Sequence, residues 1–252
     1  MIKITQLFTI LTSFLLLQGC GKLATATLST ETTAVTIPKN AASPSHCLGI
    51  YNVPTKRKVV ALTFDDGPDE VYTKKVLKIL KKYRVKATFF MVGKNVSAYP
   101  RVVKQVYASG HVIANHTNQH RNLAWLEEEA MTAEIMAGNE AIFRVIGRKP
   151  TLFRPPYGAC SAKLPQVVEQ AGMKLIMWNA TTDDYRDQQT TPDKIVTAIL
   201  SLVTPGAIIL LHDAGGNRQK TVTALSTIIK ILKLLDYDFV TVPKLLKIAP
   251  YQ

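Results

Sequence analysis

From residue 58 onward, the chain alternates short apolar runs with longer stretches in which apolar residues recur at helical spacing. Short runs rich in β-branched and aromatic residues are typical of buried strands, and a period near 3.6 residues is typical of amphipathic helices. This pattern predicts strands over 58–64, 86–91, 111–114, 151–153, 173–177, 206–211 and 238–242. It predicts helices over 70–83, 100–109, 125–146, 161–171, 192–203 and 218–235.

The regular alternation of strands and helices predicts a parallel sheet with helices on its outside. About seven such units without a dinucleotide-type glycine motif favour a barrel, irregular or incompletely closed, over an open doubly wound sheet. The expected fold class is therefore α/β, an irregular (β/α)7-type barrel that resembles a distorted TIM barrel. In barrels of this kind, the loops that follow the strands gather at one end, and catalytic residues lie there.

The N-terminal segment has a different pattern. Lys3 is followed by an uncharged apolar run over 7–17, which is shorter than the about 20 residues that span a bilayer. The run ends in Leu17-Gln18-Gly19-Cys20, which resembles a bacterial lipobox, in which the cysteine is acylated. We therefore expect a lipoprotein-type signal peptide over 1–19, with lipidation at Cys20.

The residues that follow are rich in Ala, Thr and Ser and have no sustained period, so a flexible tether is expected over 20–46. The folded domain is then expected over 47–252. This organisation predicts an exported protein of the bacterial cell envelope, anchored to a membrane by lipid on its periplasmic side or at the cell surface. Which membrane carries the anchor is left open.

Composition narrows these expectations further. The 252 residues are 47% hydrophobic and 19% charged, which allows one sizeable core or two small ones, and one domain is the simplest interpretation. The net charge of +13 suits contact with anionic envelope polymers. Nucleic acid is not an expected partner because the protein is exported. The spacing of four lysines places them along one side of a predicted helix, which is the usual pattern of a solvated face: Lys74, Lys78, Lys81 and Lys82.

The first candidate chemical element is a carboxylate pair, Asp65-Asp66, which follows an apolar strand and precedes Gly67-Pro68. Two adjacent acids repel one another unless a cation or hydrogen bonds compensate, so they favour a metal site. A turn with a helix cap is the alternative.

Two histidines supply further ligand types. His116 and His120 are four residues apart, a spacing that places both imidazoles on one side of a helical turn. Alone, such a pair is more often a surface coincidence. With one aspartate it offers two nitrogens and one oxygen, a ligand set that leaves positions open for water and substrate and so indicates catalysis.

Two more elements follow predicted strands. The segment from Arg154 to Gly158 carries two prolines, which fix an extended backbone able to hold a guanidinium in place. His212 ends a run of aliphatic residues, where a histidine is either a satisfied core residue or a general acid tuned by a nearby carboxylate.

Taken together, these segments resemble the polysaccharide deacetylases, carbohydrate esterase family four. The motifs that carry the resemblance are Thr63-Phe64-Asp65-Asp66-Gly67-Pro68, His116-Thr117-x-x-His120, Arg154-Pro155-Pro156-Tyr157-Gly158 and Leu210-Leu211-His212, and the similarity covers about 58–245. The resemblance implies removal of N-acetyl groups from an N-acetylglucosamine-containing polymer, with release of acetate. Peptidoglycan, chitin oligomers and poly-N-acetylglucosamine are all candidate substrates.

The same resemblance implies a role for each matching residue. Asp65 is the expected base, His212 the acid and Asp184 the carboxylate that tunes it. Arg154 is expected to orient Asp65, and the backbone N–H of Tyr157 to stabilise the oxyanion.

The expected ligands of a divalent metal are Asp66, His116 and His120, with zinc the first choice and cobalt, manganese or nickel the alternatives. Tyr185, Leu210 and Trp178 are expected to contact substrate, although Tyr185 replaces a tryptophan usual in the family, and Thr181 an aspartate that is frequent there. These departures affect the expected acetyl pocket and leave the ligands and proton carriers intact.

Cys47 and Cys160 remain once Cys20 takes lipid, and a disulfide or two buried thiols are both open. Two alternative functions are also open: an O-acetyl esterase of the xylan type on the same fold, and a glycan-binding protein of the envelope without turnover.

Overall fold

The computed structural model describes residues 47–186 and 188–252. The predicted signal peptide, the lipidation site at Cys20 and the tether lie outside the described residues. Within the described part of the chain, no helix is both long enough and apolar enough to cross a membrane.

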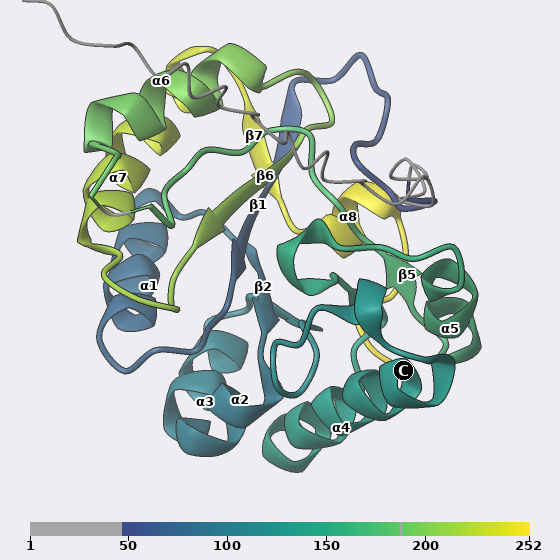
Figure 1. Ribbon diagram of the computed structural model, residues 1–252. Coiled ribbons are helices and arrows are strands. Elements are labelled where there is room, and N and C mark those ends of the chain that lie inside the picture. Colours follow the sequence, from purple (N-terminus) through teal and green to yellow (C-terminus); the bar gives the residue numbers. More distant parts are fainter. Residues whose placement is uncertain (1–46, 187) are drawn as a thin grey trace, which may run out of the picture. The chain divides into compact units, whose positions relative to one another are not determined.

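One parallel sheet organises the described chain (Figure 1). Its strands are β1 Val59–Asp65, β2 Thr88–Met91, β3 Val112–Asn115, β4 Leu152–Phe153, β5 Lys174–Leu175, β6 Ile208–His212 and β7 Asp238–Val240. The order across the sheet is β5-β4-β3-β2-β1-β6, with β7 also paired to β1. Each of the seven predicted strands is present.

Helices fill the connections between the strands. They are α1 Tyr72–Tyr83, α2 Gly93–Ala98, α3 Pro100–Ala108, α4 Glu128–Ile146, α5 Leu164–Gln170, α6 Pro192–Leu202, α7 Gln219–Leu234 and α8 Val242–Leu246, with short 3₁₀ turns η1 Leu123–Trp125 and η2 Pro156–Gly158. The short helices α2 and α8 were not predicted, since neither is long enough to show a helical period. The helix predicted from residue 125 begins instead at Glu128, after η1.

The alternation of side chains along β1 explains how the strand ends supply a site. Leu62 and Phe64 pack outward in the cluster shared with α1, α6 and α7. Val59 and Ala61 belong to an inner cluster shared with the other strands and with α8. Because side chains alternate between faces, Asp65 at the carboxyl end points to the inner side.

Closure of the barrel is irregular between β5 and β6. Single bridges join Ile50 to Ile176 and Ala180 to Ile209, in place of a full ladder. The backbone N–H of Leu210 donates to the carbonyl of Ala180 over 2.9 Å, which fixes the chain at this seam. The fold is therefore an irregular (β/α)7 barrel, and the predicted fold class is confirmed.

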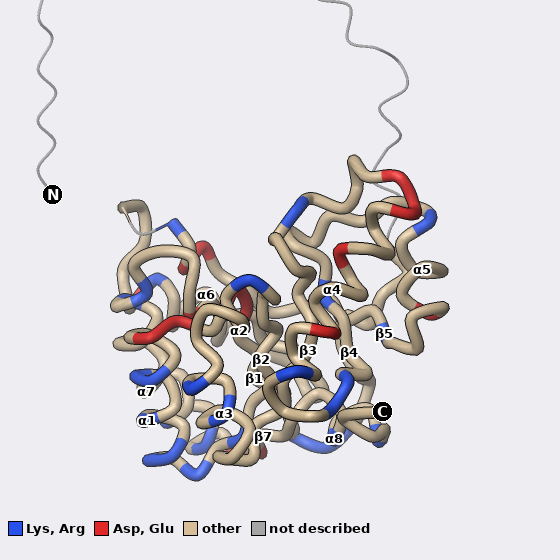
Figure 2. The backbone as a smooth tube through the Cα atoms, turned by 90° about the horizontal axis from the view of Figure 1, so that it is seen from below, with Lys and Arg blue, Asp and Glu red and all other residues tan. Residues whose placement is uncertain are grey.

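Charged residues are unevenly placed over the helices. Figure 2 shows positive positions along α1 and α7. On α1, Lys74, Lys78 and Lys81 are exposed while Val76 and Leu80 are buried. The lysine stripe is thus the solvated face that the sequence predicted.

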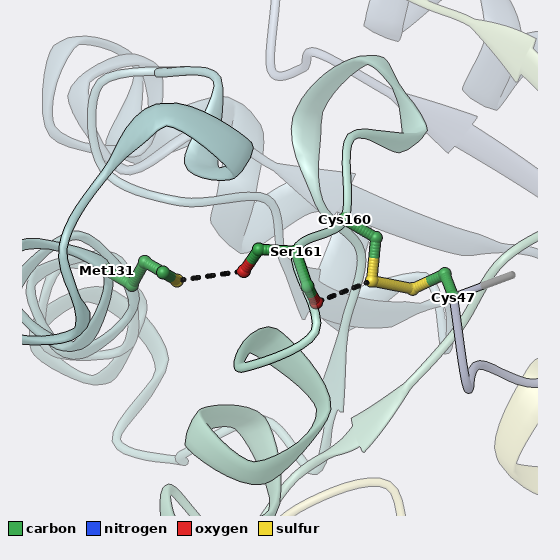
Figure 3. The surroundings of a disulfide bond; sticks show 4 residues. All are labelled: Cys47, Met131, Cys160 and Ser161. Atoms are coloured by element: carbon green, nitrogen blue, oxygen red, sulfur yellow. Dashed lines mark hydrogen bonds between the residues drawn. A yellow bond between two sulfur atoms is a disulfide. The ribbon is translucent and has the colours of Figure 1, made fainter. Parts of the chain in front are cut away.

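A disulfide joins Cys47, where the described chain begins, to Cys160 in the loop after η2 (Figure 3). The two Cα atoms are 5.6 Å apart, and 113 residues separate the cysteines in sequence. Beside it, the hydroxyl of Ser161 contacts the sulfur of Met131 on α4. The link ties the start of the domain to the segment that carries Arg154 and Tyr157.

Candidate metal and active site

The strand-end residues predicted from the sequence meet at one end of the barrel. Residues of β6 alternate as those of β1 do: Ile209 and Leu211 pack outward, and Ile208 packs inward. Leu210 and His212 therefore face the inner side. The same rule carries His116 inward, two positions after the inner residue Ala114.

Asp66, His116 and His120 form a compact cluster of metal-ligand type. Their ligand atoms all lie within 4.8 Å of one another. Oδ1 of Asp66 is 3.1 Å from Nε2 of His120 and 3.6 Å from Nε2 of His116. Burial alone would raise the pKa of Asp66, but the adjacent imidazoles of His116 and His120 lower that pKa far below its ordinary value.

The histidines do not lie on a helical turn, so that prediction was wrong. Thr117 and His120 have φ values of 68° and 60°, in the left-handed region. The N–H of Thr117 donates to Oδ1 of Asn115, and the next two N–H groups donate to Oε2 of Glu134. Because side chains take these N–H groups, the backbone forms a loop and not a helix.

In both imidazoles Nε2 faces Asp66, and the other ring nitrogen, Nδ1, has a hydrogen-bond partner. These partners show whether the two rings are oriented as metal ligands. Nδ1 of His116 lies 2.7 Å from the carbonyl oxygen of Arg154, so it must carry the proton, and Nε2 of the neutral ring keeps its lone pair. Nδ1 of His120 shares a hydrogen bond of 3.1 Å with the Tyr157 hydroxyl. Such outer partners orient metal-binding histidines. The donor set and its support therefore fit a divalent cation.

Asp65 differs from its neighbour because it has a permanent cationic partner. The fully buried guanidinium of Arg154 donates from Nη1 to Oδ1 of Asp65 over 2.6 Å and to the Thr63 hydroxyl over 2.8 Å. Nη2 donates to the carbonyl of Met177. Oδ2 of Asp65 is left facing the cluster, 3.8 Å from Nε2 of His116.

His212 is paired with Asp184. Its Nδ1 lies 2.7 Å from Oδ1 of Asp184, and its backbone N–H donates to Oδ2 over 2.8 Å. The Thr221 hydroxyl also donates to Oδ2. Burial alone would lower the pKa of His212, but the charge and hydrogen bond of Asp184, with Asp66 and Asp65 nearby, raise it to about 9.

A cavity of about 820 Å³ lies over these groups. Tyr185, Leu210 and Trp178 all line it, as do Tyr157 and His212. Tyr157 has a φ of 61°, and the following Gly158 has a φ of 64°. A Cβ on that glycine would lie 2.8 Å from the Trp178 ring, so the loop can pack on this ring only with glycine there.

Several groups in or beneath the cavity were missed by sequence reasoning. Asn95 of α2 donates to the backbone carbonyl of Asp66, and Arg218 donates to the carbonyls of Ala214 and Gly215. Both side chains line the cavity. The only local signal was the glycine pair before Arg218, because a glycine permits close approach of the backbone.

Asp213 is a third missed residue and lies fully buried beneath the site. It accepts a hydrogen bond from Thr73, and burial, opposed by that hydrogen bond, raises its pKa to about 7.

Comparison with known proteins shows to which family the chain belongs. Residues 52–176 match the family model described as polysaccharide deacetylase. A peptidoglycan-N-acetylglucosamine deacetylase of Bacillus cereus is 38% identical over 197 residues, which cover 78% of this chain and 92% of that protein. A chitooligosaccharide deacetylase of Rhizobium leguminosarum bv. trifolii is 35% identical over 196 residues, covering 73% of this chain and 90% of the relative.

Solved structures agree. The crystal structure of the Bc1960 peptidoglycan N-acetylglucosamine deacetylase, in complex with an N-hydroxybenzamide, superposes with a TM-score of 0.78 at 35% identity. The match covers 82% of this chain and 96% of that one. The chain therefore belongs to the polysaccharide deacetylase family, whose named relatives here remove N-acetyl groups, and its cluster of one aspartate and two histidines suits the metal dependence of that family.

Proposed function

We propose that this protein removes N-acetyl groups from an N-acetylglucosamine-containing polysaccharide of the cell envelope, releasing acetate and a free amine. The observation that carries the proposal is the arrangement around one cavity of the cluster Asp66, His116 and His120 with Asp65 and His212, whose partners Arg154 and Asp184 are buried beside them. Relatives of similar length are named for peptidoglycan and for chitooligosaccharides.

Asp66, His116 and His120 would hold the divalent metal, and zinc suits their two nitrogens and one oxygen best, ahead of cobalt, manganese and nickel. A metal bound there supplies a Lewis acid for the acetamide carbonyl and acidifies bound water. The chain's own residues then have separate tasks. Asp65 takes the proton of the attacking water at Oδ2, the oxygen that Arg154 leaves free.

His212 is the residue that donates a proton to the leaving amine. With Nδ1 held by Asp184, Nε2 is the atom that can pass a proton to the leaving nitrogen, and the raised pKa keeps the ring protonated at neutral pH. The backbone N–H of Tyr157 stabilises the developing oxyanion. Trp178, Tyr185 and Leu210 shape the wall against which the acetyl group lies.

A product assay on four polymers tests the reaction. Peptidoglycan, chitin oligomers, poly-N-acetylglucosamine and acetylated xylan are incubated side by side, and acetate and free amine are measured. We expect acetate with an equal amount of amine from at least one amino-sugar polymer. Acetate from xylan alone would indicate the O-acetyl esterase, and binding without acetate would indicate a glycan-binding protein.

For location, the proposal is a signal peptide over 1–19, a lipid on Cys20, a tether over 20–46 and the catalytic domain over 47–252. The support is the Leu17-Gln18-Gly19-Cys20 sequence and the polar composition after it. Wild-type protein should incorporate labelled lipid and require detergent for extraction, whereas Cys20→Ser should not be labelled. Unlabelled wild-type protein would contradict the anchor.

A further inference from the structure

A second groove adjoins the catalytic cavity. It is lined by His120, Arg121, Asn122, Trp125, Leu126 and Tyr157. Two of these residues, His120 and Tyr157, also line the catalytic cavity. The groove therefore begins at the metal cluster and leads away from it, past the 3₁₀ turn η1.

Trp125 is the most prominent side chain of the groove, because 84% of it is exposed. The turn beneath it is firmly held. Leu123 is fully buried, the N–H of Ala124 donates to Oδ1 of Asn122 over 3.0 Å, and the N–H of Leu126 donates to the Leu123 carbonyl over 3.1 Å. The indole belongs to none of the buried clusters of the described chain, and it lines one groove together with the exposed Tyr157 ring. Exposed apolar surface that is gathered in one place, unlike a single exposed side chain, marks binding sites.

The other side chains of the groove suit a sugar. Tyr157 is 70% exposed, and its hydroxyl bonds to His120. An indole offers a flat apolar face to the C–H surface of a pyranose ring, while Arg121 and the free amide hydrogens of Asn122 can donate to hydroxyl groups. A glycan whose acetamide reaches the metal cluster must leave the cavity along one of its rims, and this rim carries Trp125 and Tyr157, the two most exposed aromatic side chains of the described chain.

We propose that the groove formed by Trp125, Tyr157 and Arg121 is a subsite for the sugar that neighbours the one being deacetylated. Trp125 stacks on the ring of that sugar and so selects for a polymer over a monosaccharide. The proposal rests on the proposed function for the identity of the ligand. The contacts that define the groove do not depend on the proposed function.

The test combines kinetics with binding on chitin oligomers of increasing length. Trp125→Ala should lower kcat/KM for long oligomers about five- to tenfold, the size of one good aromatic contact, and change it little for N-acetylglucosamine itself. Trp125→Phe should keep most of the activity. Leu234→Ala removes an 81% exposed apolar side chain at the end of α7 and should change neither value.

Binding is measured separately, by isothermal titration calorimetry in the Asp65→Asn background, where the oligomer is consumed far more slowly. A long oligomer should bind, and an added Trp125→Ala should weaken its Kd about five- to tenfold. Acetate release without any effect of Trp125 would overturn the subsite alone. Trp125-dependent binding without acetate from any polymer would instead overturn the proposed function. An effect seen only with peptide-bearing peptidoglycan fragments would assign the groove to the stem peptide and also overturn this inference.

Discussion

The two carboxylates at the end of β1, Asp65 and Asp66, are adjacent in sequence but are held in different ways. Asp65 lies buried against the guanidinium of Arg154, just as the buried Asp184 is paired with His212. In the described part of the chain, the ion-pair partners of Asp66 are two imidazoles, which carry no charge when they act as ligands. The negative charge of Asp65 is thus compensated by Arg154, whereas that of Asp66 can be compensated by a bound metal cation.

The backbone conformation also differs between Asp65 and Asp66. Asp65 and His212 are the last residues of regular strands, in register with each other across β1 and β6. Asp66, with a φ of 75°, and His120 lie on left-handed backbone in loops. Side chains at strand ends are positioned by the sheet, whereas the loop ligands depend on local hydrogen bonds such as that from Asn95 to the Asp66 carbonyl. The comparison therefore predicts separable effects of substitution.

The largest effect is expected from His116→Ala. Loss of an outer partner of a metal ligand costs about 10–100-fold in affinity, so loss of a ligand itself should cost more and reduce activity to background. Elemental analysis of the purified, folded variant measures the metal, and acetate release measures activity. In wild-type protein, a chelator should abolish activity and added metal should restore it. Full metal content in the variant would contradict the assigned cluster.

Asp65→Asn is expected to lower kcat by about 10²–10⁴-fold, the usual cost of losing a general base. The amide oxygen can still accept from Arg154, and Asp66, His116 and His120 are unchanged, so metal content should stay at the wild-type level. Asp183→Asn is the matched control, because this exposed carboxylate lines the same cavity and should be dispensable. Loss of metal from Asp65→Asn would mean that the roles of the two aspartates are reversed.

Asp184→Asn should change the pH dependence of activity. His212 must be protonated to act as an acid, so activity falls as pH rises through its pKa, which Asp184 helps to raise to about 9. Removing that charge leaves burial to lower the pKa, and the falling limb of the kcat profile should move to lower pH by about 1–2 units. A profile of unchanged shape, with less folded protein, would assign Asp184 a structural role only.

The sequence predicted the strand-end half of this site better than the loop half. Asp65, Arg154 and His212 directly follow apolar runs, and strand ends in a parallel barrel converge, so their proximity follows from topology. The turn at His116–His120 was predicted as helical because spacing alone does not reveal that Asn115 and Glu134 take its N–H groups. Left-handed backbone at non-glycine residues runs against local preference and depends on tertiary contacts.

The groove beside Trp125 was also beyond sequence reasoning. The residue falls at the start of an amphipathic pattern and was assigned to the helix that begins instead at Glu128. Asn95 and Arg218 reach the cavity from α2 and from the loop before α7, elements whose packing on the strand ends has no local signature.

The smallest effect on activity is expected from the double change Cys47→Ser, Cys160→Ser. The disulfide closes a loop of 113 residues, and its loss should lower the free energy of unfolding by about 2–5 kcal/mol. Activity should remain, because Arg154 at the base of the same loop is fixed by Asp65 and Thr63 and not by the cysteines. Urea unfolding of the wild-type protein with and without reductant, compared with the variant, separates the two quantities. A fall in kcat/KM of the folded variant would show that the disulfide holds the loop carrying Tyr157 in place. The residues at the strand ends would then also depend on a contact outside the sheet, as the metal ligands in the loops do.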